Sequence, residues 1–289
     1  MTTTALAPLP RRLASLVRIE HTVFALPFAY VGAFLGAAGW PGLGDVVWVT
    51  IAMVGARTIA MALNRLADAE LDARNPRTAA RELPRGAVSR NQVLALIGAA
   101  LVVFLAAVFQ LDPVVRWLWP IPVAMFFVYP YLKRFTWLCH VWLGACIGLA
   151  PVGAWLAVSG TAPWEAWVIG GAVLLWVAGF DLFYSLYDLE HDRSEGLHSW
   201  AVRFGERGVF LGARAFHAGT VTLLAVAGAG LDAGVSYWAG VVATVALLAY
   251  EHAIVRPGDL RRLDAAFFTV NGVISVVFFV FVALDVLVG

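Results

Sequence analysis

The sequence predicts an all-α fold, a polytopic membrane protein built as a bundle of about nine transmembrane helices. Hydrophobic residues make up 61% of the 289 residues and charged residues only 13%. A soluble domain carries about 25% charged residues, so this composition is typical of a chain that folds in a lipid bilayer. The mean hydropathy of +0.81 and a series of long apolar segments indicate the same environment.

Apolar segments of suitable length recur along the whole chain. A helix that crosses the hydrocarbon core needs about 20 mostly apolar residues. The fourth segment is the shortest, and its two prolines lie in its first turn, where a missing backbone N–H costs little. We predict a single transmembrane domain over residues 1–289, with these spans in chain order: Thr22–Trp40, Val46–Leu63, Val93–Phe109, Trp117–Tyr129, Val141–Val158, Trp164–Phe180, Phe210–Gly230, Tyr237–Ala253 and Ala265–Val288.

Lysines and arginines are concentrated in alternate loops. They precede the first span or follow the second, fourth, sixth and eighth spans, and only Arg57, Arg116 and Arg214 fall elsewhere. Positive charge collects on the cytoplasmic side of membrane proteins. The pattern therefore predicts a cytoplasmic N-terminus, a multi-pass location in the cytoplasmic (inner) membrane if the source is bacterial, and chemistry that faces the cytoplasm.

The first group of candidate functional residues follows the second predicted span. Asn64, Asp68 and Asp72 are spaced four residues apart. If the helix continues through them, an amide and two carboxylates share one face. Like charges at this spacing repel one another, so the face needs a counter-charge.

A second group follows the sixth predicted span. Asp181, Tyr184, Asp188 and Asp192 follow one another at intervals of three, four and four residues, which again defines one helix face. The topology predicts that this face emerges on the same side of the membrane as the first group. A single pair of aspartates is usually a solvated helix end, whereas two groups on one side favour a common ligand.

The chemistry of that ligand follows from the donor atoms. Mg²⁺ prefers oxygen ligands and is usually held by one or two carboxylates together with substrate phosphate oxygens. We therefore predict Mg²⁺ as the cofactor, flanking a diphosphate, with these metal ligands: Asp68, Asp72, Asp188 and Asp192.

Three basic residues are candidates for binding the substrates. Arg57 lies within the second span, and a charge inside a span indicates a functional site, although a snorkelling arginine is the alternative. Lys133 and Arg134 are the only charged residues of a tight loop. They are predicted to bind the diphosphate, the alternative being that they only anchor the topology.

Together these motifs resemble the UbiA family of membrane prenyltransferases. Asn64, Asp68 and Asp72 match its Asn-x-x-x-Asp-x-x-x-Asp motif, and the later aspartates fit its second Asp-rich motif. The matches cover residues 18 to 205, and the nine spans match the helix count of the family. Further matching motifs are Arg77-Thr78-Ala79-x-Arg81-x-Leu83-Pro84-x-Gly86, Tyr129-Pro130-Tyr131-x-Lys133-Arg134-x-Thr136, Gly196-x-x-Ser199 and Phe204-Gly205.

The resemblance implies Mg²⁺-dependent transfer of a polyprenyl group from its diphosphate to a hydroxylated aromatic carboxylic acid in ubiquinone or menaquinone synthesis. Carried onto this sequence, it implies that Asp181 positions or deprotonates the acceptor and that Arg18 holds the acceptor's carboxylate. The implied catalytic residues are Asp181, Lys133 and Arg134, and the implied substrate-binding residues are Arg18, Arg57, Asn64, Lys133, Arg134 and Tyr184.

The resemblance leaves two aromatic acids as the expected acceptor, and the alternative is another prenyl transfer of the same family with a different aromatic acceptor. The resemblance to quinone-pathway enzymes implies 4-hydroxybenzoate. Arg65, however, stands where many members have aspartate, and with the segment 75–78 it is similar to the futalosine-route menaquinone branch, whose acceptor is 1,4-dihydroxy-6-naphthoate. The expected partners are these substrates and the lipid bilayer. A net charge of +1 gives no case for nucleic acid, and no protein partner is implied.

The sequence disfavours two other classes of membrane protein. A transporter is disfavoured because no chain of carboxylates crosses the spans and no duplicated half is evident. A CDP-alcohol phosphotransferase is disfavoured because its contiguous Asp-Gly…Ala-Arg…Gly…Asp…Asp signature is absent.

Overall fold

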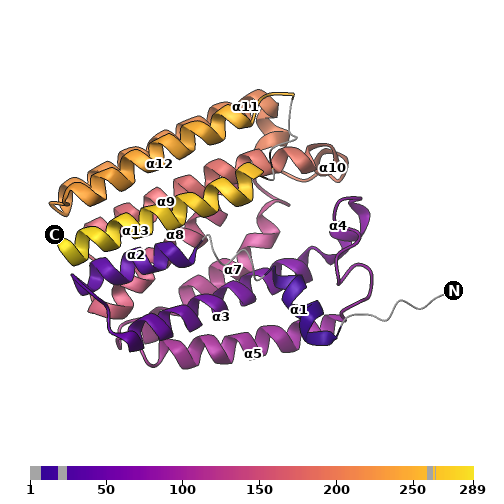
Figure 1. The fold of residues 1–289 in the computed structure, drawn as a ribbon. Helices are drawn as coiled ribbons and strands as arrows, with labels where there is room; N and C mark the ends of the chain where they lie inside the picture. The colour runs from indigo at the N-terminus through magenta and orange to yellow at the C-terminus, as the bar shows by residue number, and fades with distance from the viewer. Residues whose placement is uncertain (1–7, 19–24, 259–262, 264) are drawn as a thin grey trace.

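The computed structural model describes residues 8–18, 25–258, 263 and 265–289, and within these ranges the secondary structure is helical. The helices pack side by side as a bundle (Figure 1). In chain order they are α1 (Leu9–Val17), α2 (Leu26–Ala37), α3 (Leu43–Ala67), α4 (Ala69–Arg74), α5 (Arg90–Val108), α6 (Val115–Leu118), α7 (Pro120–Leu132), α8 (Cys139–Ser159), α9 (Trp164–Tyr184), the 3₁₀ helix η2 (Ser185–Asp188), α10 (Leu189–Ser194), α11 (Trp200–Gly230), α12 (Val235–Ile254), the π-helix η3 (Ala265–Val270) and α13 (Asn271–Val288).

Within the described ranges, seven helices are long and apolar enough to cross a membrane, and they contain α3, α5, α8, α9, α11, α12 and α13. This confirms the predicted all-α membrane fold. The predicted first and fourth spans correspond to the shorter helices α2, of 12 residues, and α7, of 13 residues. The count of about nine is therefore approximate. The predicted start of the first span, residues 22–24, lies outside the described residues.

Several helix boundaries differ from the prediction. Helix α11 begins at Trp200 rather than at Phe210, and it bends at Gly205, whose φ of 67° is accessible to glycine at little cost. The last span begins as the π-helix η3. Helix α1, which lies before the predicted spans, packs on α3.

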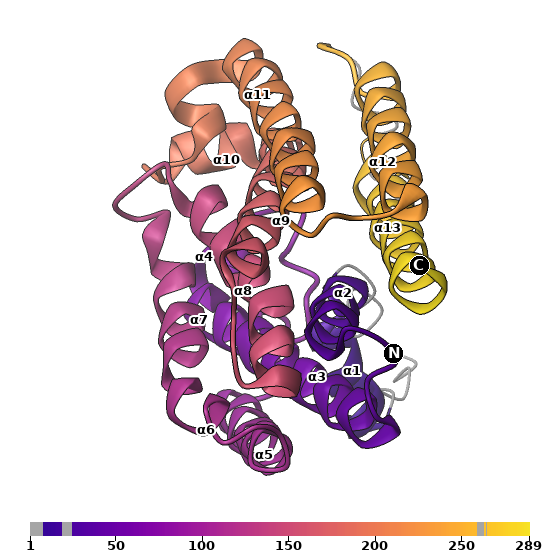
Figure 2. The same cartoon turned by 90° about the vertical axis from the view of Figure 1, so that its left-hand side faces the viewer.

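The four-residue spacing suggests that a continuous helix carries each motif. In the structure both helices are interrupted within the motifs. Helix α3 ends at Ala67, and Asp68 has φ −96° and ψ 5°, so the short helix α4 starts anew after it. Helix α9 likewise ends at Tyr184 and passes through η2 into α10. Figure 1 shows α4 and α10 at the same end of the bundle, and Figure 2 views the bundle from the opposite end. The two motifs therefore meet at one end of the molecule.

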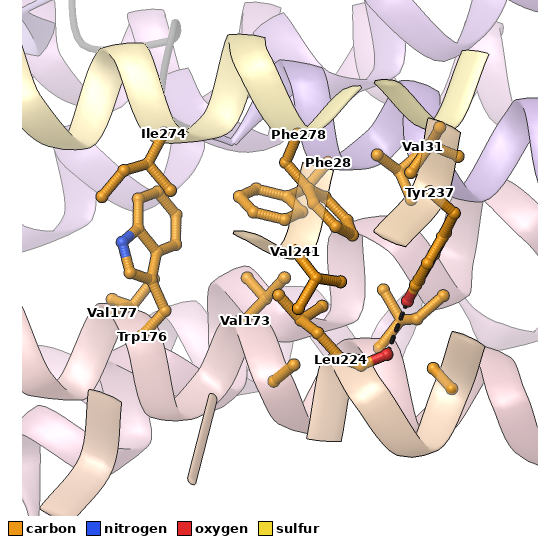
Figure 3. Close-up of a cluster of buried hydrophobic side chains, with 14 of the residues drawn as sticks. Phe28, Val31, Val173, Trp176, Val177, Leu224, Tyr237, Val241, Ile274 and Phe278 are labelled. Carbon is orange, nitrogen blue, oxygen red and sulfur yellow. Dashed lines mark hydrogen bonds between the residues drawn. The ribbon is translucent and has the colours of Figure 1, made fainter. Parts of the chain in front are cut away.

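The main core lies between α2, α9, α11, α12 and α13. Trp176 of α9 packs against Phe28 of α2, with ring centroids 5.0 Å apart, and Phe28 in turn packs against Phe278 of α13 (Figure 3). The hydroxyl of Tyr237 donates a hydrogen bond of 2.8 Å to the carbonyl oxygen of Leu224. The aromatic packing thus links α9 to α13 through α2.

Glycines allow α8 to approach its neighbours closely. A Cβ atom on Gly144 would lie 2.2 Å from the carbonyl oxygen of Leu174 in α9. A Cβ atom on Gly32 of α2 would lie 2.0 Å from the carbonyl oxygen of Pro151 in α8. Small residues at such contacts let membrane helices touch along their backbones. Helices α8 and α9 are thereby held in the register that sets the cavity wall.

Candidate active site

A cavity of about 700 Å³ opens among α3, α7, α8 and α9. Nearly all the residues predicted from the sequence line it. Arg134 is the exception. It does not line this cavity, but it donates a hydrogen bond to Asp68, which does. The predicted residues on the cavity wall are Arg18, Arg57, Asn64, Asp68, Asp72, Lys133, Asp181, Tyr184, Asp188 and Asp192.

The cavity has a polar end and a long apolar end. Along α3 its lining runs from Asp68 back to Val49, which corresponds to about 28 Å of helix at 1.5 Å per residue. The deep wall includes Met53 of α3, Phe104 of α5 and Trp119 beside α7. Such a space accommodates a long hydrocarbon next to a highly polar group.

Asp68 is surrounded by positive charge. Its Oδ2 lies 3.0 Å from Lys133 Nζ and accepts a hydrogen bond of 3.2 Å from the Asn64 amide. Its Oδ1 accepts one of 3.3 Å from Arg134 Nη2, which also donates to the carbonyl oxygen of Ala67 at 3.0 Å. Only 6% of the Asp68 side chain is exposed, so this charge needs its cationic partners.

Asp72 is held by a second arginine. Arg81 Nη1 lies 2.8 Å from both carboxylate oxygens of Asp72. Thr78 Oγ1 donates a hydrogen bond of 3.0 Å to the Asp72 carbonyl oxygen. The segment that follows α4 therefore folds back onto the first motif.

The same segment also reaches the second motif. Arg77 Nε donates a hydrogen bond of 2.9 Å to Asp188 Oδ1, and Arg77 Nη2 donates to Asp188 Oδ2. Asn75 Nδ2 donates to Asp188 Oδ1 at 2.8 Å, and Arg77 Nη1 donates to the Tyr184 hydroxyl at 3.2 Å. Burial acts to lower the pKa of Arg77, but the hydrogen bond and charge of Asp188 outweigh it and raise the pKa above its usual value.

Asn75, Arg77 and Arg81 are site residues that the prediction did not include. All three line the cavity. The available signal was the match of the 77–86 segment to a family motif, which carried no role for its arginines. Spacing alone cannot show that a loop residue pairs with an aspartate more than a hundred residues later.

Asp192 of the second motif is held by a neutral side chain. It is buried, and its side chain is hydrogen-bonded to Ser199. Ser199 is the N-cap of α11 and accepts a hydrogen bond of 3.3 Å from the Val202 amide. The Gly196-x-x-Ser199 segment thus supports the second motif.

Asp181 has a partner that the sequence did not indicate. Its Oδ2 lies 2.7 Å from Nδ1 of His140, in the first turn of α8. Both side chains line the cavity and are largely buried. Two described histidines, His140 and His191, line the cavity, and His140 is the one that contacts Asp181.

Arg57 lies deeper in the cavity than the aspartates. Its Nε is buried and has no hydrogen-bond partner among the described residues. Tyr129 of α7, also on the cavity wall, is close enough to interact electrostatically with Arg57, and also with Asp181 and Asp68. A buried guanidinium with an unused donor is suited to an anionic ligand.

The donor set suits a magnesium ion that shares its coordination with a substrate. Within the described ranges, no three His, Cys, Asp or Glu side chains converge as a ready-made metal site. Mg²⁺ rarely uses such all-protein cages and takes phosphate oxygens and waters beside one or two carboxylates. Four motif carboxylates around one cavity fit that requirement.

Comparisons with known proteins identify the family to which the chain is similar. The model of the UbiA prenyltransferase family matches residues 25–280. The 4-hydroxybenzoate octaprenyltransferase of Xanthomonas euvesicatoria pv. vesicatoria is 32% identical over 91% of this chain and 85% of the relative. The protein of the same name from Cupriavidus necator is 29% identical over 88% of this chain and 90% of the relative.

Solved structures show the same fold. The apo structure of a UbiA homolog from Aeropyrum pernix K1 matches with a TM-score of 0.85 at 34% identity, covering 93% of this chain and 99% of that one. A UbiA homolog from Archaeoglobus fulgidus bound to GPP and Mg²⁺ matches with a TM-score of 0.75 at 20% identity, covering 95% and 99% of the two chains.

Proposed function

Because the chain belongs to the UbiA prenyltransferase family, we propose that it transfers a prenyl group from a prenyl diphosphate to the ring of a hydroxylated aromatic carboxylic acid. The chain is a multi-pass integral membrane protein. One observation carries the proposal: the carboxylates of two motifs far apart in the sequence line a single cavity whose other end is apolar.

The polar end is assigned to Mg²⁺ and the diphosphate. The residues that would hold the metal are Asp68, Asp72, Asp188 and Asp192. When bound, Mg²⁺ supplies Lewis-acid stabilisation of the negative charge that develops on the leaving diphosphate. The Archaeoglobus homolog, whose structure was determined with GPP and Mg²⁺, supports this assignment.

The side chains around the aspartates bind the diphosphate. Lys133 and Arg77 lie within reach of the motif carboxylates and can turn to phosphate oxygens as the carboxylates take up the metal. Asn64 adds a neutral donor and Arg134 holds Asp68 from outside the cavity. The bond between prenyl C1 and the diphosphate oxygen then breaks, and its electrons leave with the diphosphate.

The apolar part of the cavity protects the resulting allylic cation. Water is excluded by the hydrocarbon lining along α3, α7 and α8. The face of the Tyr184 ring already contacts a cation, because the Arg77 guanidinium lies 5.4 Å from the ring centroid. An aromatic face of this kind stabilises positive charge.

The acceptor is assigned to the space between Arg57 and Asp181. Arg57, with its unused donor beside Tyr129, binds the acceptor carboxylate. Arg18, the candidate for this role from the sequence, lies on the cavity wall as a second cation. The ring carbon ortho to the hydroxyl attacks prenyl C1, and Asp181 accepts the proton that this carbon loses.

We propose 4-hydroxybenzoate as the acceptor, because the similar curated relatives are named for it. The second candidate is 1,4-dihydroxy-6-naphthoate, favoured by Arg65, which departs from the family pattern and lines the cavity. The distribution of basic residues supports a cytoplasmic opening of the site and, in a bacterium, a location in the inner membrane.

The test is a reconstituted reaction. Purified protein with Mg²⁺, geranyl diphosphate and either acid should release pyrophosphate and form a C-prenylated product, identified by mass spectrometry. Asp68→Ala should lower the rate by about 100-fold or more, since it removes a principal charge of the site. Asp45→Ala, at the opposite end of α3 and away from the cavity, is the control. Full activity in the Asp68 variant would refute the site.

A further inference from the structure

We propose that His140 is a positioning residue that fixes the Asp181 carboxylate for proton removal from the acceptor ring. The inference rests on the proposed function, in which Asp181 is the proton acceptor. It adds a group outside both aspartate motifs to the machinery of the reaction.

The contact joins two elements at the polar end of the cavity. His140 lies in the first turn of α8 and Asp181 in the last turn of α9. His140 Nδ1 and Asp181 Oδ2 are 2.7 Å apart, and the side chains are only 8% and 15% exposed. Little water therefore competes for this hydrogen bond, and the carboxylate orientation depends on the imidazole.

Both nitrogens of the imidazole are engaged. The backbone N–H of Trp200 donates a hydrogen bond of 3.4 Å to His140 Nε2. Nε2 faces this amide and Nδ1 faces Asp181, so Nδ1 is the nitrogen that donates a hydrogen bond to the carboxylate. His140 therefore has no nitrogen left for the acceptor, which makes it a residue that acts through Asp181.

The partner of Nε2 is itself well fixed. Trp200 is the first residue of α11, directly after the N-cap Ser199, whose side chain accepts from the Val202 amide. Ser199 is also hydrogen-bonded to Asp192. At the start of α11, Trp200 thus holds the imidazole, and the preceding residue, Ser199, holds the second aspartate motif.

The consequence for the reaction concerns the other carboxylate oxygen. With Oδ2 of Asp181 held by the imidazole, Oδ1 is the atom available to the acceptor. When the new carbon–carbon bond has formed, the ring proton passes to Oδ1 and the electrons of that C–H bond restore the aromatic ring. His140 keeps its proton throughout, so the step balances without another reactant.

The experiment compares two substitutions at one position. His140→Leu removes the donor to Asp181, whereas His140→Asn can place an amide N–H near the position of Nδ1. His198→Leu is the matched control, because its imidazole is exposed and only its backbone takes part in the site. The turnover number and KM are measured for geranyl diphosphate and 4-hydroxybenzoate, with unlabelled acceptor and with acceptor deuterated ortho to the hydroxyl.

We expect His140→Leu to lower the turnover number by about 10- to 100-fold, the scale of losses from a misplaced reacting group. The KM for geranyl diphosphate should stay the same. A deuterium isotope effect larger than that of the wild type should appear, because proton removal becomes slower relative to the other steps. His140→Asn should recover most of the rate, and His198→Leu should match the wild type.

Two results would overturn the inference. One is a His140→Leu enzyme with wild-type turnover and no added isotope effect. The other is equal loss in the leucine and asparagine variants together with a higher donor KM, which would give His140 a purely structural role. A wild-type protein that forms no prenylated product would instead refute the proposed function, and the inference with it.

Discussion

The backbone N–H of His198 donates a hydrogen bond of 2.6 Å to the carbonyl oxygen of Lys133. It ties the loop after α7 to the segment that leads into α11. Lys133 contacts Asp68 of the first motif. Ser199, which follows His198 in the chain, is hydrogen-bonded to Asp192 of the second motif. The two motifs are therefore connected by protein contacts on the α7–α11 side, as well as by Arg77 on the other side.

Removal of the Arg57 charge should weaken the binding of the acceptor and leave the binding of the prenyl diphosphate unchanged. A hydrogen bond to a charged group contributes about 1.5–3 kcal/mol, so Arg57→Leu is expected to raise the KM for 4-hydroxybenzoate by roughly 10- to 100-fold. The KM for geranyl diphosphate should not change. Steady-state kinetics with each substrate varied in turn distinguishes the two.

The control for this experiment is Arg214→Leu, which removes the arginine that lies inside the predicted seventh span but away from the cavity. An equal rise in the donor KM of the Arg57 variant would place the guanidinium at the diphosphate instead.

Replacement of Arg77 should increase the gain in thermal stability that Mg²⁺ and pyrophosphate give the protein, because Arg77 pairs with Asp188. Without metal, Arg77→Leu leaves the Asp188 carboxylate without its bidentate partner, at a cost of about 1 kcal/mol for a partly exposed pair. With Mg²⁺ and diphosphate, the carboxylate regains a cation. The variant should therefore melt below the wild type in EDTA and gain more than the wild type from Mg²⁺ and pyrophosphate.

Thermal unfolding of detergent-solubilised protein measures this difference. Arg85→Leu serves as the control, since Arg85 is exposed and does not line the cavity. The assignment is wrong if both variants respond to Mg²⁺ and pyrophosphate as the wild type does.

Gly144→Ala should destabilise the bundle. The added Cβ would lie 2.2 Å from a backbone oxygen of α9, so the two helices must move apart. Overpacking of this kind costs about 1–3 kcal/mol. The melting temperature should fall, and activity should fall with it because α8 and α9 carry His140 and Asp181.

Gly98→Ala on α5 is the matched substitution, because nothing lies within 4 Å of its Cβ position. We expect it to be neutral or slightly stabilising, since alanine is the better helix former. Equal melting temperatures for the two variants would contradict the close contact.

A bulky residue in the apolar end of the cavity should select against long donors. Gly153 lines the cavity and has no atom within 4 Å of its Cβ position. It lies about 21 Å along α8 from the polar end. Gly153→Phe should lower kcat/KM for octaprenyl diphosphate by about tenfold or more, the effect of roughly 1.4 kcal/mol of lost contact.

The same variant should use geranyl diphosphate nearly as well as the wild type, because a short chain does not reach this depth. Gly98→Phe, on an exposed face of α5, controls for a general effect of the added ring. Equal losses with both donors in Gly153→Phe would show that the tail takes another path.

Periodicity and composition were sufficient for the fold, because a membrane span imposes length and apolarity on each helix. They were not sufficient for the ends of helices. The interruption at Asp68 and the π-helix at Ala265–Val270 leave no mark on hydropathy. Helix α2 ends before the predicted limit of the first span, because the residues that follow it up to Trp40 extend the hydropathy signal without being helical.

The predicted site residues came together: all except Arg134 line the cavity, and Arg134 contacts the cavity residue Asp68. The aspartates were predictable because two groups of carboxylates on the same side of the membrane favour a common ligand. His140 was not, because a lone histidine at the start of an apolar helix carries no periodic signal. Arg77 and Arg81 sit in an irregular segment, where sequence distance says nothing about which carboxylate a side chain reaches.

The arginines and the lysine around the motifs have a consequence for biogenesis. Asp68, Asp72 and Asp188 each have a cationic side chain within hydrogen-bonding distance. These partners neutralise the carboxylates, so the helices of a nascent chain can assemble in the bilayer before any metal ion or ligand binds. Loading the finished molecule is then an exchange of partners at the membrane surface, and its rate depends on how readily those internal pairs open.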